Sequence, residues 1–130
     1  MKTLLPPGWP RPKGYANGVS AKGRIVVTAG VVGWNAEEQF ESDDLVDQVR
    51  QALDNVRAVI AEAGAAPEHL VRLTWYITDK REYLAHLAGV GRVYRRVIGR
   101  HFPAMTLVQV AALLEDRAKV EIEATAVVPA

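Results

Sequence analysis

The chain has 130 residues, of which 49% are hydrophobic and 24% are charged. This is the ordinary mixture of a globular protein, and the length suits one domain, so we expect residues 1–130 to form a single domain. Sixteen Lys and Arg against fifteen Asp and Glu leave a formal net charge of +1, with no basic block. This balance argues against nucleic acid or an anionic membrane as partner and favours a small molecule.

Metal and cofactor motifs are missing from the sequence. There is no cysteine, so no disulfide, thiol nucleophile or thiolate metal site is expected. His69, His86 and His101 lack metal-ligand spacing, and the glycines do not follow nucleotide-binding spacing. No apolar run approaches the ~20 residues of a bilayer span, and prolines interrupt the N-terminus before a signal-peptide core. A cytoplasmic location is the default expectation.

The first third of the chain combines an arm with two short strands. Residues 1–14 are rich in proline and glycine, which predicts an irregular extended arm in which Trp9 is expected to be buried. The runs 15–20 and 24–29 flank Ala21-Lys22-Gly23, a connection that fits a β-hairpin. After Gly30 we expect a loop from Val31 to Glu41, which leaves the end of a central strand and is well placed to carry a site.

A helix is predicted where apolar residues recur at helical spacing from Leu45 to Ile60. Ser42-Asp43-Asp44 precedes it, and acidic residues near a helix N-terminus favour the helix dipole. Gly64 follows, and it is expected to take the left-handed conformation that ends many helices. The apolar stripe is wide enough to pack on a sheet.

The middle of the chain repeats the order strand, then helix. Residues 71–78 alternate apolar and more polar side chains, which predicts a strand. Asp79-Lys80-Arg81-Glu82 resembles a capping box, so a second helix is expected to begin there and to end at Gly99. Gly89 and Gly91 weaken this helix by about 1 kcal/mol each relative to Ala, so we expect something to pack closely against it.

Two further strands are predicted at residues 101–110 and 119–128, joined by a short hairpin-like connection at 113–117. Successive side chains of a strand point to opposite faces. In the last strand Glu121 and Glu123 therefore share one face, opposite Val120, Ile122, Ala124 and Ala126. The two carboxylates are either a solvated surface pair or part of a covered site, where burial would raise the pKa of a carboxyl group toward that of a general acid or base.

The resulting order is β-β-α-β-α-β-β, an α/β fold with a mixed sheet. Right-handed connections would place both helices on one face of the sheet. The other face would be bare, although its strands carry side chains such as Thr74 and Val108, so we expect self-association to cover it.

A basic cluster is expected at the end of the second helix, formed by Arg92, Arg95, Arg96 and Arg100. It either complements the helix dipole on a solvated face or places one arginine, or His101, beside an anionic ligand.

Four motifs in order resemble the Rid family, the reactive intermediate deaminases also called the YjgF family. They are Gly30 after a strand, Gln51-Ala52-Leu53-Asp54-Asn55-Val56, Phe102-Pro103-Ala104 and Val120-Glu121-Ile122-Glu123-Ala124, and the likeness extends from Tyr15 to Val128. The resemblance implies a chorismate-mutase-like α/β fold. It also implies a homotrimer with a central barrel and small-molecule clefts between neighbouring subunits.

The resemblance also implies roles for particular residues. In deaminating members, an arginine after Phe-Pro-Ala holds the substrate carboxylate, and a glutamate of the last strand positions the water that hydrolyses an enamine or imine. The glutamate corresponds to Glu121 and the arginine position to Met105. Met105 cannot make charge-assisted contacts to a carboxylate, so an atypical substrate is expected. The remaining substrate-binding candidates are Tyr15, Gly30, Val31, Tyr94 and Leu107, with Tyr94 similar to an aromatic residue that the neighbouring subunit supplies.

Three functions remain open from the sequence. The first is a Rid-type enamine or imine hydrolase that needs no cofactor and uses Glu121. The second is a small-molecule-binding or regulatory trimer that kept the cleft and lost the chemistry, which the absence of the arginine favours. The third, ribonuclease activity, has been attached to parts of the family, and the near-neutral charge argues against it.

Overall fold

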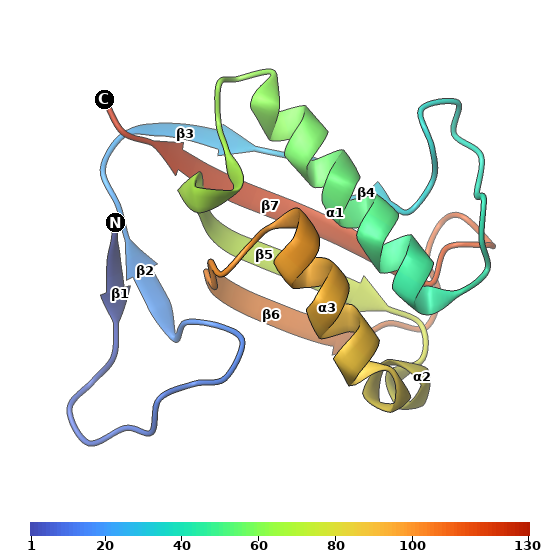
Figure 1. Cartoon of the computed structure of the whole chain (residues 1–130), viewed down its shortest axis with the longest axis horizontal. Coiled ribbons are helices and arrows are strands. Elements are labelled where there is room, and N and C mark those ends of the chain that lie inside the picture. The colour runs from blue at the N-terminus through green and yellow to red at the C-terminus, as the bar shows by residue number, and fades with distance from the viewer.

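Strand β7 (Val120–Val128) lies inside the main sheet of the computed structural model, which describes residues 1–130 (Figure 1). The strand order is β3-β7-β5-β6, with β3 at Arg24–Val27, β5 at Leu70–Ile77 and β6 at Ala104–Gln109. The two-residue β4 (Val31–Val32) also pairs with β7. All pairings with β7 are antiparallel, whereas β5 and β6 are parallel. The predicted mixed sheet is therefore confirmed.

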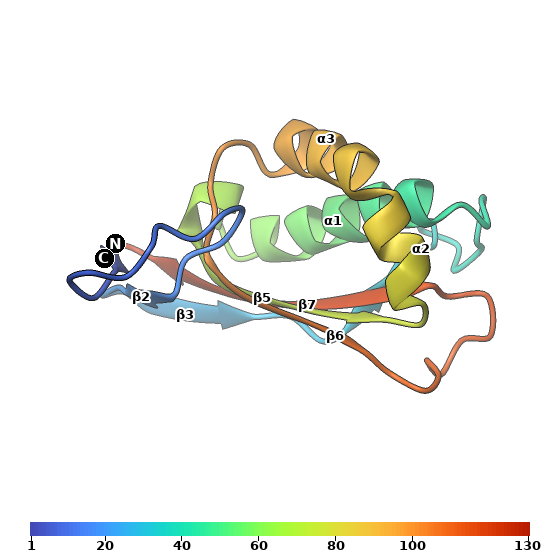
Figure 2. The same cartoon turned by 90° about the horizontal axis from the view of Figure 1, so that it is seen from below.

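The helices cover one face of this sheet and leave the other bare (Figure 2). They are α1 (Leu45–Ala61), α2 (Lys80–Ala85) and α3 (Leu87–Val97), and a short 3-10 helix at Pro67–His69 precedes β5. Their placement on one face confirms the expectation from the handedness of the connections. None of the helices is long and apolar enough to cross a bilayer.

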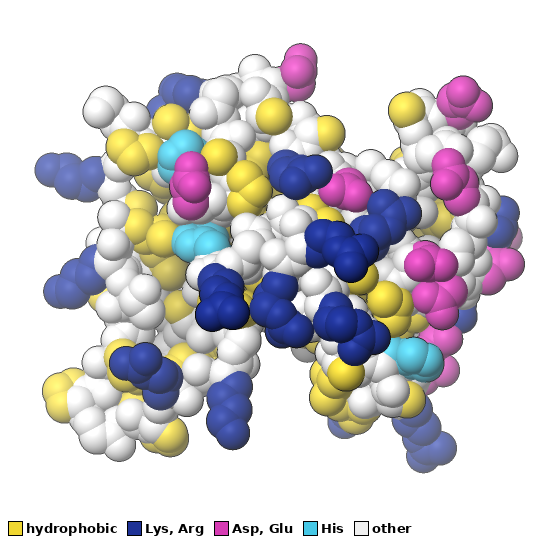
Figure 3. Space-filling model, viewed as in Figure 1, with side chains coloured by type: hydrophobic (Ala, Val, Ile, Leu, Met, Phe, Trp, Pro, Cys, Tyr) yellow, Lys and Arg dark blue, Asp and Glu magenta, His cyan; other side chains and the backbone are white.

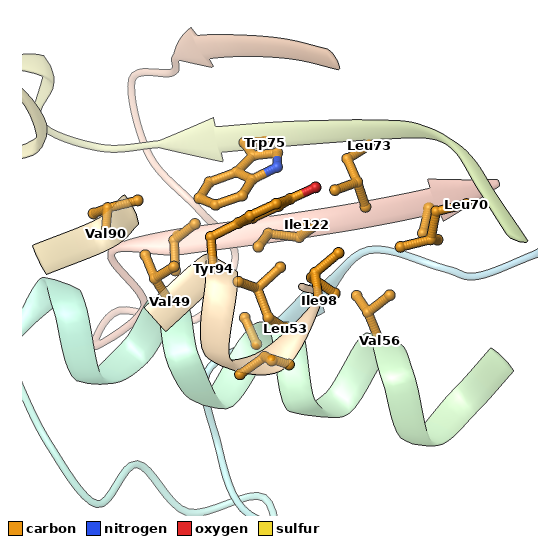
Figure 4. Close-up of a cluster of buried hydrophobic side chains, with 14 of the residues drawn as sticks. Val49, Leu53, Val56, Leu70, Leu73, Trp75, Val90, Tyr94, Ile98 and Ile122 are labelled. Atoms are coloured by element: carbon orange, nitrogen blue, oxygen red, sulfur yellow. The ribbon is translucent and has the colours of Figure 1, made fainter. Parts of the chain in front are cut away.

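The core lies between the helices and the covered face of the sheet (Figure 4). Alternate residues of β7 are buried there, as predicted: Val120, Ile122, Ala124 and Ala126. α1 packs onto them with a stripe that includes Val49, Leu53 and Val56, none of which is exposed. Each fully buried aliphatic side chain of this kind stabilises the fold by roughly 1.5–3 kcal/mol. The outward residues of β7 therefore have no core role.

The N-terminal region differs from the sequence prediction. Lys2–Leu4 form strand β1, which pairs antiparallel with β2 (Gly18–Ser20) in a separate two-stranded sheet. The wholly irregular arm and the hairpin between residues 15–20 and 24–29 were therefore wrong. Residues 2–4 precede the first proline and keep their amide donors, so they can pair, while β3 finds its partner in β7. Trp9 was expected to be buried and is 58% exposed.

The last two strands are not neighbours. β5 lies between β6 and β7, so the hairpin-like connection at 113–117 was wrong. A crossover through α3 lays β6 parallel beside β5, and β7 then fills the position between β3 and β5, where both of its edges are hydrogen-bonded. Val31, expected in a loop, begins β4 and is paired with Ile122.

The second helical region is divided. Asp79 caps α2, since the Glu82 amide donates to Asp79 Oδ1 at 3.1 Å. In a capping box the Glu82 side chain would accept from the Asp79 amide in return. Here it forms an ion pair with Lys119 Nζ at 2.8 Å instead. His86, with φ −121° and ψ 20°, separates α2 from α3. A β-carbon at Gly89 would lie 3.0 Å from Val46 Cγ2, so the close packing expected at this glycine is confirmed.

Gln48 fastens the start of β7 to helix α1. Its side chain is 1% exposed, and its Nε2 donates to the carbonyls of Ser42 and Arg117, each at 3.0 Å. Its Oε1 accepts from the Lys119 amide at 2.8 Å. Both the nitrogen and the oxygen of this amide are therefore hydrogen-bonded, and they hold the chain two residues before Glu121.

Gln48→Ala should lower the free energy of unfolding by about 2–3 kcal/mol, because it leaves two carbonyls and one amide without their buried partner. Urea denaturation measures this change. Gln51→Ala is the matched control, since Gln51 is half-buried on the same helix and makes one bond, to Asn55 Oδ1. We expect a loss below about 1 kcal/mol for it, and equal losses in the two variants would contradict the anchoring role of Gln48.

Candidate functional site

A recess of about 580 Å³ lies between the N-terminal arm, helices α2 and α3 and strand β6, and we call it the aromatic pocket. Most of its lining is apolar or aromatic. The lining residues are Lys13, Gly14, Tyr15, Trp75, Tyr83, Leu87, Val90, Gly91, Tyr94, Arg95, Phe102, Met105 and Leu107. Pockets of this size and character suit small molecules.

The register of β6 directs two of the predicted residues into this pocket. Met105 pairs with Leu73 and Leu107 pairs with Trp75, and both partners are buried beneath the helices. Paired residues of neighbouring strands point to the same face of a sheet. Met105 and Leu107 therefore face the helices, where they are partly buried and line the pocket.

Tyr94 fixes one wall of the aromatic pocket. It is 5% exposed, its ring stacks on Phe102 with centroids 5.5 Å apart, and its hydroxyl donates to the His101 carbonyl at 2.6 Å. Burial raises the pKa of Tyr94 well above its ordinary value, so the phenol stays neutral. Trp75 lies beside it, with ring centroids 6.4 Å apart (Figure 4). Trp75 Nε1 is a buried donor without a partner in the chain.

A second recess, of about 540 Å³, lies at the edge of the sheet beside β4, and we call it the edge groove. Gly30, Val31 and Glu121 line it. A β-carbon at position 30 would overlap Glu121 Oε2, so glycine leaves the space that this carboxylate occupies. Asn55 Nδ2 holds the adjoining loop by donating to the carbonyls of Val32 at 2.9 Å and Trp34 at 2.8 Å.

The two carboxylates of β7 differ in their partners. Glu123 accepts a hydrogen bond of 2.6 Å from the Tyr76 hydroxyl on β5. This bond, with smaller contributions from burial and from both glutamates, raises the pKa of Tyr76. Glu121 has no ion pair in the chain, because the acidic partners of the ion pairs are Asp43, Asp54 and Glu82. Its carboxylate is free to hold a water molecule or a ligand.

The predicted site residues fall into two groups within one chain. Tyr15, Tyr94, Met105 and Leu107 line the aromatic pocket, whereas Gly30, Val31 and Glu121 line the edge groove. Met105 points to the face of the sheet that the helices cover, and Glu121 points to the bare face. A single chain therefore does not bring Glu121 to the aromatic residues.

Of the cations considered from the sequence, only Arg95 lines the aromatic pocket. Arg100 and His101 line a recess beside the N-terminal strands, and His101 Nε2 donates to the Leu70 carbonyl at 2.6 Å. Lys13 and Arg95 line the aromatic pocket instead. Membership of the basic cluster was the only sequence signal for Arg95, and nothing in the arm marked Lys13. No group of three or more His, Asp or Glu side chains is arranged to hold a metal ion.

Comparison with known proteins defines the family. A family model described as Endoribonuclease L-PSP matches residues 10–128. The chain therefore belongs to this family, in agreement with its resemblance to the Rid proteins.

Relatives and solved structures give the same assignment. A 2-iminobutanoate/2-iminopropanoate deaminase of Escherichia coli is 34% identical over 116 residues, which are 87% of this chain and 86% of the relative. The crystal structure of YyfB, a Rid protein of unknown function from Yersinia pestis, matches with a TM-score of 0.85 and 31% identity over 98% of both chains. That of E. coli TdcF with bound serine matches with a TM-score of 0.68 and 32% identity, again over 98% of both.

The bond between Tyr76 and Glu123 should make stability depend on alkaline pH. Because the folded chain raises the pKa of Tyr76, the stabilisation is fully present below the ordinary tyrosine pKa of about 10 and is lost as pH rises through the folded pKa. The difference in unfolding free energy between the native chain and Tyr76→Phe should therefore shrink as the pH rises above about 10. Urea denaturation across this range measures it, and a constant difference would contradict the role of the bond.

Proposed function

We propose that the chain is a Rid-type hydrolase that converts an enamine or imine to a ketone and ammonia, with Glu121 positioning the attacking water. The observation that carries the proposal is the half-buried Glu121 carboxylate, which lies in a groove against Gly30 without an ion-pair partner. The identity to a named iminobutanoate/iminopropanoate deaminase supports the reaction class.

The chemistry requires one group that alternately accepts and returns a proton. An enamine that gains a proton at carbon becomes an iminium ion. Glu121 accepts a proton from water as the water oxygen bonds to the iminium carbon, and the product is a neutral carbinolamine. The carboxyl group gives this proton to the nitrogen. The carbon–nitrogen bond then breaks and ammonia leaves, while the hydroxyl group of the carbinolamine returns its proton to the Glu121 carboxylate and becomes the carbonyl. No metal or cofactor is needed for these steps.

The complete site would form between copies of the chain. Each copy carries both recesses, so the edge groove of one copy can face the aromatic pocket of the next, and a closed ring of three gives three equal sites. The bare face supports such an assembly, because Ile25 and Val27 are 70% and 66% exposed on it. In this homotrimer the bare faces would line the central barrel. Tyr94 of one copy would contact the substrate, and Glu121 would come from the neighbouring copy.

Met105 favours a second candidate function, that of a small-molecule-binding or regulatory trimer without catalysis. The family's deaminating members are expected to hold a carboxylate at this position through an arginine. A thioether supplies no positive charge, so small 2-imino acids would lose their anchor. The unengaged Glu121 carboxylate favours the hydrolase over this alternative.

Ammonia release from a panel of enamines and imines, with and without a carboxylate, tests the hydrolase. Glu121→Gln keeps the side-chain volume but removes the proton acceptor, so turnover should fall about 10²- to 10⁴-fold. Glu123→Gln is the matched control on the same face and should retain most of the turnover, because Glu123 is engaged by Tyr76. No turnover on any substrate by an intact trimer would favour the binding module.

Met105→Arg should improve the handling of small 2-imino acids. The new guanidinium would enter the aromatic pocket from β6 and could form a charge-assisted pair with the substrate carboxylate, so KM for 2-iminopropanoate should fall about tenfold. Steady-state kinetics measure the change, and Met105→Leu, which adds no charge, should leave KM unaltered. A folded, trimeric Met105→Arg chain with unchanged KM would contradict the expectation that the carboxylate of a small 2-imino acid comes within reach of residue 105.

A further inference from the structure

Two cations stand at the aromatic pocket where β6 supplies none. Arg95 comes from α3 and Lys13 from the N-terminal arm, and no acidic residue shares the lining with them. Neither takes part in the ion pairs of the chain, whose basic members are Arg50, Arg57, Arg117 and Lys119. The pocket therefore combines an apolar body with two positive charges that the chain does not neutralise.

The side chain of Arg95 is folded back along its own helix. Its Nη1 lies 3.3 Å from the position that a β-carbon would occupy on Gly91, one turn earlier, and Gly91 itself lines the pocket. Because Gly91 has no side chain, the guanidinium can rest against the helix at this rim. Lys and Arg side chains gather over α3 on the face seen in Figure 3, and Arg95 is the member of the basic cluster that lines the pocket.

The rest of the lining indicates the shape of the ligand. Tyr15, Tyr83, Tyr94 and Phe102 supply aromatic surface, and Met105 and Leu107 supply a flexible apolar floor. Aromatic rings pack favourably on such a surface. A compound as small as 2-iminopropanoate would leave much of the 580 Å³ unfilled, whereas a substrate with a phenyl-sized side chain uses it.

We propose that the aromatic pocket selects an aromatic carboxylate, with its anionic end held by Arg95 and Lys13 and its ring among the tyrosines and Phe102. The inference rests on the proposed function only in taking the pocket as the substrate-binding half of the deaminase site. Arg95 and Lys13 bind the carboxylate that an arginine at position 105 would otherwise bind. They reach the ligand from the rim of the pocket, so the carboxylate stays near solvent while the apolar part is buried.

Phenylpyruvate, the ketone product of an aromatic 2-imino acid, is a suitable probe because its binding needs no catalysis. Isothermal titration calorimetry compares it with pyruvate, which lacks the ring, and with phenylacetone, which lacks the carboxylate. We expect phenylpyruvate to bind at least about tenfold more tightly than either, since only phenylpyruvate offers both the ring to the apolar lining and the carboxylate to the two cations. Raising the salt concentration should weaken phenylpyruvate binding and leave phenylacetone binding unchanged.

The variants separate this anchor from general surface charge. Arg95→Gln should weaken phenylpyruvate binding about tenfold, and Arg95→Lys should restore part of the loss. Lys13→Gln should have a smaller effect, because an ammonium group cannot make the paired hydrogen bonds that a guanidinium makes to a carboxylate. Arg96→Gln, which removes the same charge from the next residue of α3 but lies outside the pocket, should change nothing. Chromatography with light scattering checks that each variant keeps the native oligomeric state.

Opposite outcomes separate the two proposals. If phenylpyruvate binds through Arg95 and no imine is hydrolysed, the carboxylate-binding role of Arg95 is supported and the proposed hydrolase activity is contradicted. If aromatic 2-imino acids are hydrolysed with equal efficiency by the native chain and by Arg95→Gln, the role of Arg95 is contradicted and the hydrolase activity is supported. Equal losses for Arg95→Gln and Arg96→Gln, or dissociation of the oligomer by Arg95→Gln without weaker binding, would also overturn the anchor. In the latter case Arg95 pairs with a neighbouring copy instead of a ligand.

Discussion

Strict alternation along β7 is the constraint on which the site depends. Because α1 lies against one face of this strand, every second residue from Val120 to Ala126 is committed to the core. The residues between them must point to the bare face, and two of them are glutamates. Tyr76 satisfies Glu123, whereas Gly30 makes room for Glu121 and gives it no partner. The unpaired carboxylate of Glu121 is thus a consequence of how the core is packed.

Local patterns allowed prediction of those parts of the fold that depend on neighbours in the sequence. Helix α1 was predicted in this way from its periodicity, its acidic start and Gly64 after its end, which has φ +75°. The pairing of the strands could not be predicted from local patterns. Residues 24–27 look like half of a hairpin in isolation, yet they pair with residues 125–128 at the other end of the chain. The same holds for β1, because its partner lies beyond the proline-rich arm.

Resemblance to a family allowed part of the aromatic pocket to be predicted. Tyr15, Tyr94, Met105 and Leu107 were identified by resemblance, and the fold gathers them in one pocket. Their separation from Glu121 was not readable in one sequence, because it depends on which face of the sheet each strand residue takes once β5 lies between β6 and β7. Lys13 was missed, and Arg95 was predicted only as one of several candidates, because the choice depends on how the arm and helix α3 lie around the aromatic pocket.

A cation at the rim has different consequences from one on β6. An arginine at position 105 would point toward Trp75 and the helices, in partly desolvated surroundings. There it would bind a carboxylate strongly, which favours a short substrate whose carboxylate reaches strand β6. Lys13 and Arg95 are exposed, so their attraction for an anion is weaker and more easily screened. The affinity lost at the charge can be recovered through apolar contact, since each buried CH₂ group contributes about 0.8 kcal/mol. Moving the charge outward therefore favours larger, apolar substrates over the smallest imino acids.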